Sequence, residues 1–198
     1  SMRLLVIRHG ESEADILRVC EGRADFGLTE RGHRQAEAMG SYVGQNYQID
    51  KIYCSTLKRA VQTAEHLGAK VGLPLILDGQ LMEFNNGLLA GLEYSVAEKK
   101  YPRVEMPLHS AVYEQESALD FRYRAEYMLS KLTSEHEEDS TIAVLTHGGM
   151  INQLYRAFFR LPVDSKFGFQ TGDTGIHEWV ISKESRVVVR ANYIPHSI

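Results

Sequence analysis

The chain has 198 residues, of which 43% are hydrophobic and 24% charged, a composition typical of a globular domain rather than a disordered, fibrous or membrane protein. Twenty-two Lys and Arg against 26 Asp and Glu give a formal net charge of −4, which provides no broad basic surface for nucleic acid or anionic lipid. No apolar run approaches the length of about 18 residues that crosses a bilayer.

The predicted elements alternate between strands and helices. The apolar run at residues 4–7 predicts a strand buried on both faces, and helical spacing follows from Thr29, a predicted N-cap, to about Gln48. The rest are, in chain order, a strand at 51–54, a helix at 57–71, a strand at 75–77, a helix opened by a capping box at 117–120, a strand at 141–145, a helix at 150–158 and a hairpin of strands 176–181 and 187–193.

This order of elements predicts a three-layer α/β/α fold. Strands that alternate with helices indicate a mostly parallel central sheet, here with a C-terminal antiparallel hairpin. The sequence has no internal repeat or linker, so we expect residues 2–198 to form a single domain. The weakly periodic segment 87–116 is longer than an ordinary connection and is predicted to be a lid or specificity insertion.

The cysteines and the start of the sequence favour a cytoplasmic location. Cys20 and Cys54 are not spaced as a disulfide framework or a metal site, and so few cysteines suit a reducing compartment. Ser1-Met2 is typical of a tag remnant before a native start, and the strand that follows leaves no room for a signal sequence.

Polar motifs follow three predicted strands where those strands end. They are R-H-G-E-S at 8–12, S-T-L-K-R at 55–59 and T-H-G-G at 146–149. Because ligands of open α/β sheets bind at the carboxyl ends of the strands, we expect two histidines and two arginines to meet there. Guanidinium groups suit phosphate oxygens, and a neutral imidazole can attack phosphorus. The pattern therefore predicts a nucleophile beside an anion site.

The same residues carry a family resemblance. Residues 8–12 match the signature R-H-G-[ED]-[ST], and five further segments follow in the family's order, at 25–36, 55–64, 81–91, 115–124 and 147–149. The chain resembles the histidine phosphatase superfamily, in the branch that includes phosphoglycerate mutases and small broad-specificity phosphatases. The resemblance spans residues 4 to about 180 and implies a phosphoglycerate mutase-like fold.

The resemblance also implies roles for individual residues. His9 would take the phosphoryl group, while Arg8, Arg59 and a protonated His147 would hold its oxygens. Glu83 would protonate the leaving alkoxide and then deprotonate the attacking water. No metal or other cofactor is implied, because the cationic side chains supply the positive charge. The further residues expected to bind phosphate or substrate are Gly148, Asp15, Glu21 and Gly22.

Two assignments carry alternatives. Glu11, Glu13 and Glu116 compete with Glu83 for the role of the acid. Asp15 stands where many relatives have asparagine, and its carboxylate would repel a phosphate unless it is protonated or paired, for example with Arg18 or Arg23.

The predicted function is hydrolysis of a small phosphorylated metabolite. The alternatives are a phosphoglycerate mutase and a catalytically silent domain that binds phosphorylated ligands. We expect mutases to be longer and to close the site with a C-terminal tail, which favours hydrolysis, and a binding module has no need of His9 with Glu83. Residues 92–116 are expected to choose the substrate. We expect no nucleic-acid or membrane partner, and a monomer or homodimer.

Overall fold

A six-stranded sheet forms the centre of the protein, whose residues 1–198 are all described by a computed structural model. The strand order is β3-β2-β4-β1-β5-β6. The strands are β1 (Met2–Arg8), β2 (Lys51–Cys54), β3 (Leu75–Leu77), β4 (Thr141–Thr146), β5 (Ile176–Ile181) and β6 (Arg186–Tyr193). The first four are mutually parallel, whereas β5 and β6 form an antiparallel hairpin beside β1. The predicted α/β fold with its C-terminal hairpin is therefore confirmed.

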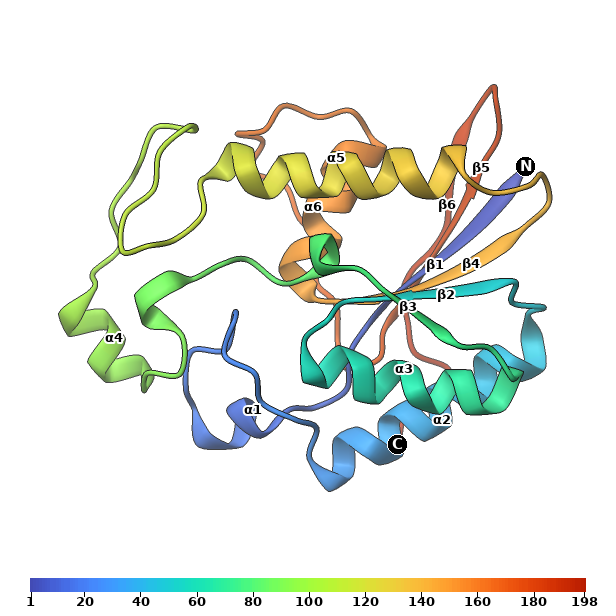
Figure 1. Ribbon diagram of the computed structural model, residues 1–198, viewed down its shortest axis with the longest axis horizontal. Coiled ribbons are helices and arrows are strands. Elements are labelled where there is room, and N and C mark those ends of the chain that lie inside the picture. The colour runs from blue at the N-terminus through green and yellow to red at the C-terminus, as the bar shows by residue number, and fades with distance from the viewer.

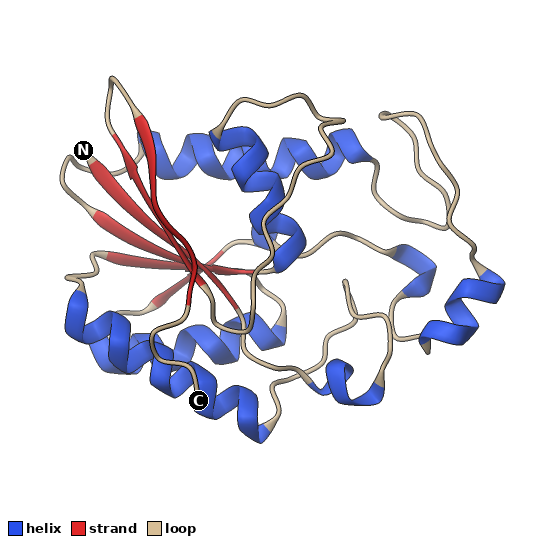
Figure 2. Ribbon diagram, turned by 180° about the vertical axis from the view of Figure 1, so that it is seen from behind, coloured by secondary structure: helices blue, strands red, loops and turns tan.

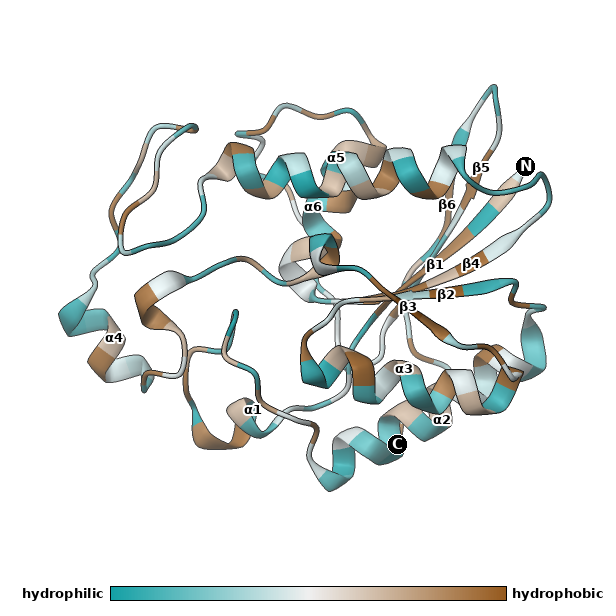
Figure 3. Cartoon of the chain, viewed as in Figure 1, coloured by the Kyte–Doolittle hydropathy of each residue, from teal (hydrophilic) through white to brown (hydrophobic).

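Helices cover both faces of the sheet. Figures 1 and 2 show α2 (Glu30–Asn46) and α3 (Lys58–Val71) on one side, and α5 (Ala118–Ser134) and α6 (Gly148–Phe158) on the other. Alternate residues of β1 point to opposite faces, so Leu4 joins the core beneath α5 and α6 while Leu5 joins the core above α2 and α3. Both side chains are at most 1% exposed. Figure 3 shows the helices banded in brown and teal, as expected for amphipathic helices.

Small and polar residues define the helix ends and contacts. Thr29 Oγ1 accepts the Gly32 N–H at 2.9 Å and caps α2 as predicted. Gly72 ends α3 with φ +70°, a conformation that side chains disfavour. At Gly40 a Cβ would lie 3.0 Å from the His66 carbonyl oxygen, so glycine allows α2 to pack closely on α3.

Two short helices were not predicted. They are α1 (Glu13–Leu17) and α4 (Tyr94–Lys100), the latter inside the segment 87–116. Short 3₁₀ turns also occur at Gly79–Leu81 and Gly87–Leu89. The segment joins the loop after α1, because Cys20 N–H donates to Leu92 O at 2.8 Å. In Figure 1, α1 and α4 lie at the same end of the molecule. None of the helices is long and apolar enough to cross a membrane.

Candidate active site

The carboxyl ends of three parallel strands bring two histidines together. His9 follows β1, Ser55 follows β2 and His147 follows β4. The imidazole centroids of His9 and His147 are 5.2 Å apart, and the residues are 2% and 0% exposed. The structure thus brings the polar ends of the strands into one buried site, as the sequence predicts.

His9 presents an unprotonated nitrogen. Its Nδ1 lies 2.7 Å from the Gly10 carbonyl oxygen, and because a carbonyl only accepts, Nδ1 carries the proton. Nε2 then holds a lone pair and accepts a hydrogen bond from Arg59 Nε at 3.3 Å. Burial, reinforced by Arg59 and Arg8, lowers the pKa of His9 well below its usual value. The neutral imidazole is the nucleophilic form.

Arg59 is fixed by main-chain carbonyls in the loop before α2. Its Nη1 donates to Ala24 O at 3.0 Å and its Nη2 to Gly22 O at 2.8 Å. Its Nε also lies 3.2 Å from a carboxylate oxygen of Glu21. A cation in the first turn of α3 opposes the helix dipole, and Glu21 supplies compensating negative charge. Each terminal nitrogen of Arg59 keeps one N–H for another acceptor.

The protein groups around His147 favour its neutral form. Burial is the main cause that lowers its pKa well below the usual value, followed by the charge of Arg59. Its Nε2 lies 2.8 Å from Ser55 Oγ, whereas its buried Nδ1 has no hydrogen-bond partner in the protein. An anion beside Nδ1 would favour protonation again, so the charge of His147 depends on what it binds.

Two donors near the start of α6 have no hydrogen-bond partner. Arg8 Nη1 donates to Thr171 O at 2.7 Å, but the buried Arg8 Nε has no partner. The Gly148 N–H, in the first turn of α6, makes no hydrogen bond either. A Cβ on Gly148 would lie 3.8 Å from Arg8 Nε, so Gly148 is a neighbour of the Arg8 guanidinium. An unpaired N–H at a helix N-terminus, next to an unpaired guanidinium nitrogen, is suited to an anion.

Glu83 lies at the N-terminus of the same helix. Its carboxylate accepts N–H groups from Gly149 at 3.0 Å, Met150 at 3.1 Å and its own neighbour Phe84 at 2.9 Å. A Cβ on Gly149 would overlap Glu83 Oε1 and lie 3.0 Å from Cδ. Glycine at position 149 is therefore what allows the carboxylate to approach the helix.

Sequence analysis assigned no function to Arg124, although it lies in one of the matching motifs. Its guanidinium donates to the carbonyl oxygens of Gln80 at 2.8 Å, Met82 at 2.7 Å and Glu83 at 3.2 Å. It also pairs in bidentate fashion with Glu116, at 2.5 and 3.1 Å. Arg124 thus ties the loop that carries Glu83 to α5.

The rivals of Glu83 have other partners. Glu116 pairs with Arg124, Glu11 Oε2 lies 3.2 Å from Arg31, and Glu13 is exposed. Asp15 is also exposed, and its carboxylate accepts the Ser12 N–H at 3.0 Å. It forms no ion pair with either arginine considered for it, Arg18 or Arg23. Among the candidate acids, only Glu83 contacts the amides of α6.

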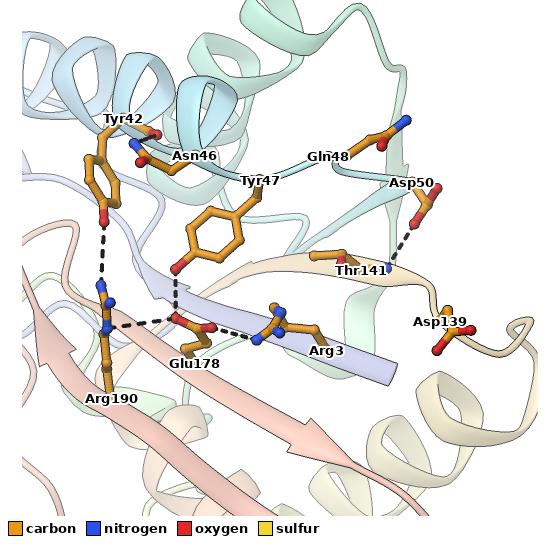
Figure 4. Close-up of a pocket in the computed structure, with 10 residues that line it drawn as sticks. All are labelled: Arg3, Tyr42, Asn46, Tyr47, Gln48, Asp50, Asp139, Thr141, Glu178 and Arg190. Atoms are coloured by element: carbon orange, nitrogen blue, oxygen red, sulfur yellow. Dashed lines mark hydrogen bonds and ion pairs between the residues drawn. The ribbon is translucent and has the colours of Figure 1, made fainter. Parts of the chain in front are cut away.

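A separate cavity of about 580 Å³ lies at the amino ends of β1 and β4, whereas His9 follows the carboxyl end of β1. Figure 4 shows the residues that line this cavity. Its central carboxylate, Glu178, is bonded to Arg3 Nη1 and to the hydroxyl of Tyr47, both at 2.6 Å. Because these groups satisfy one another, the cavity is not our candidate site. The structure also has no cluster of three or more His, Cys, Asp or Glu side chains that could hold a metal.

Comparison with known proteins identifies the family of the chain. The family model of the histidine phosphatase superfamily (branch 1) matches residues 4–194. The chain belongs to this superfamily. Its relatives include the glucosyl-3-phosphoglycerate phosphatase of Mycobacterium tuberculosis, 28% identical over an alignment of 172 positions that covers 81% of this chain and 77% of the relative. A solved structure of the mycobacterial enzyme with VO3 superposes with a TM-score of 0.84 and 25% identity, over 97% of this chain and 99% of that one.

Mutases are relatives too. The 2,3-bisphosphoglycerate-dependent phosphoglycerate mutase of Bartonella quintana is 30% identical over an alignment of 164 positions that covers 78% of this chain and 80% of the mutase. That mutase is therefore about as long as this chain, and the expectation that length separates hydrolases from mutases is wrong. The superfamily and the names of its phosphatase members indicate phosphatase activity for this chain.

Proposed function

We propose that the chain is a phosphomonoesterase that hydrolyses a small phosphorylated metabolite through a phosphohistidine at His9. The observation that supports this most directly is that an unprotonated His9 Nε2 shares its site with buried nitrogens of Arg8 and His147 that have no hydrogen-bond partner. In this proposal residues 2–198 act as a single catalytic domain, with 87–116 as its lid.

In the first step His9 Nε2 forms a bond to phosphorus as the bond from phosphorus to the ester oxygen breaks. Arg8, Arg59 and the Gly148 N–H bind the phosphoryl oxygens, and Glu83 in its acid form gives its proton to the departing alkoxide. In the second step Glu83 accepts a proton from water, whose oxygen attacks phosphorus and releases phosphate from His9. The positive charge comes from the arginines, so the proposal includes no metal.

The direct test is hydrolysis of p-nitrophenyl phosphate by the protein and by the His9→Ala variant. We expect turnover by the protein alone, and acid-labile, base-stable phosphate on the protein after rapid quenching with labelled substrate. Equal turnover by the His9→Ala variant would reject the proposal, and no turnover by either protein would favour the silent binding domain.

A mutase is the second candidate because the Bartonella quintana mutase is 30% identical to this chain, which covers 80% of its length. The two activities share the first step and differ in what receives the phosphoryl group from His9. Supplying 3-phosphoglycerate with a trace of the bisphosphate and measuring free phosphate against 2-phosphoglycerate separates them. We expect phosphate; isomer without phosphate would establish the mutase.

The substrate should be chosen by residues 92–116, next to the loop after α1. This segment offers Tyr94 and Tyr101, both aromatic, and the cations Lys99 and Arg103. A panel of sugar phosphates, phosphoglycerates, phosphoserine and nucleotides, ranked by kcat/KM, would identify the class. Substitutions in 92–116 should change that ranking, whereas an unchanged ranking would contradict the lid assignment.

A further inference from the structure

Glu21 places a carboxylate inside the proposed phosphate site. Its Oε1 lies 3.2 Å from Arg59 Nε, the same nitrogen that lies 3.3 Å from the nucleophilic Nε2 of His9. Its Oε2 accepts a hydrogen bond from Ser12 Oγ. The side chain is only 17% exposed, so solvent screens its charge weakly.

This position conflicts with the charge of a phosphoryl group. When phosphorus bonds to His9 Nε2, its oxygens enter the space beside Arg59 Nε, where Glu21 Oε1 also lies. Two anionic oxygens in contact repel each other strongly in a buried site. A carboxylic acid, by contrast, has an O–H that donates to a phosphoryl oxygen. A single proton therefore changes repulsion into a hydrogen bond.

Several charged groups face Glu21. Arg59 of α3 and Arg8 at the end of β1 favour the ionised carboxylate, whereas Asp15 of α1 opposes it. Ser12 donates a hydrogen bond to the ionised form. Burial is the largest influence, and it raises the pKa of Glu21 above its usual value in spite of Arg59.

The other titratable groups of the pocket are either histidines whose pKa is lowered or side chains already bonded to main-chain groups. Burial lowers the pKa values of both His9 and His147, so they stay neutral where an ordinary histidine begins to charge. Glu83 is bound to the amides of α6. Arg23 and Asp25, in the same loop as Glu21, are bonded to Glu83 O and the Lys58 N–H.

We propose that Glu21 binds the phosphoryl group as a neutral carboxylic acid, so that each bound phosphate dianion takes up one proton from solvent. The proton resides on the Glu21 carboxyl, is donated to a phosphoryl oxygen, and returns to solvent when the phosphate leaves. The affinity of the site for a dianion therefore falls as pH rises. As an account of catalysis this inference rests on the proposed function, but anion binding tests it without turnover.

The test uses sulfate, which keeps two negative charges from pH 5 to pH 8. Sulfate affinity is measured by calorimetry at several pH values in buffers of different ionisation enthalpy, which counts the protons taken up. For the wild-type protein we expect one proton per sulfate in the basic part of this range and an affinity that falls by about tenfold per pH unit there. The Glu21→Gln variant keeps the shape of the side chain and should bind sulfate with little pH dependence.

Two controls separate the alternatives. Glu30→Gln removes an exposed carboxylate of α2 but keeps every group that faces Glu21, so its pH dependence should match that of the wild type. Protonation of His147 would also cause proton uptake, but it would persist in Glu21→Gln. Persistence there, or no proton uptake by the wild-type protein, would overturn the inference. If sulfate behaves as expected while His9→Ala still hydrolyses p-nitrophenyl phosphate, only the proposed function fails.

Discussion

Replacing Gly149 by alanine should expel Glu83 from the N-terminus of α6 without disrupting the fold. The new Cβ overlaps Glu83 Oε1, the end of a flexible side chain rather than backbone. Glu83 would then lose its hydrogen bonds from the Gly149 and Met150 amides, now 3.0 and 3.1 Å long. Each bond to a charged group is worth about 1.5–3 kcal/mol, and water recovers part of that for the displaced carboxylate.

If the free energy that holds Glu83 in place falls by a net amount of about 1.4–2.8 kcal/mol, the rate should fall by about 10- to 100-fold. We expect that loss in kcat/KM for an alkyl phosphate, whose alkoxide must be protonated as it leaves. p-Nitrophenyl phosphate should lose less than about threefold, because its leaving group needs little protonation. kcat/KM is the right measure because it reports steps up to release of the alcohol.

Two comparisons make this prediction refutable. Because the alanine acts through Glu83, adding it to Glu83→Gln should cost nothing further. Gly148→Ala meets only Arg8 Nε at 3.8 Å and serves as the control for folding in urea. Equal losses for both substrates, or a double variant worse than Glu83→Gln, would refute the reasoning.

Three further predictions concern stability and positioning. Arg124→Met leaves Glu116 buried without its partner and should lower the free energy of unfolding by about 3 kcal/mol. Glu116→Gln in the same chain should partly restore that stability, and urea titrations that show additive losses for the two substitutions would contradict this. Burial lowers the pKa of His177 to about 4, so as pH falls below about 6.5 the unfolded chain takes up a proton first and stability falls by about 1.4 kcal/mol per pH unit. The free energy of unfolding lost between pH 7.5 and pH 5 should therefore be about 2 kcal/mol smaller in His177→Gln than in the wild type. An equal loss in both proteins would exclude His177 as its source. Glu178→Gln removes the central charge of the ion network in Figure 4 and should cost about 1–2 kcal/mol in urea while leaving phosphatase kinetics unchanged; altered kinetics would show that the two ends of the sheet communicate.

The sequence by itself determined the elements of the core. The apolar run at 4–7 specifies a buried strand because both faces of β1 are covered, and the cap at Thr29 specifies where α2 begins. Polar residues directly after strands identified His9 and His147 as neighbours, since parallel strands end at one edge of the sheet. By contrast, α1 and α4 are too short to show helical periodicity in the sequence. The hydrogen bond from Cys20 to Leu92 joins the loop after α1 to the segment that contains α4, and this contact forms only in the folded chain.

Only the tertiary structure decided the charges and partners within the site. The family resemblance implies a protonated His147 beside phosphate, whereas the pKa of this histidine in the protein depends on burial and on Arg59, which is distant in the chain. In the sequence Arg124 is an ordinary helix residue, whereas in the structure its guanidinium donates to three carbonyl oxygens around Glu83. Local pattern specifies elements because hydrophobic periodicity is local, whereas desolvation and hydrogen bonding in a pocket depend on segments that meet only after folding.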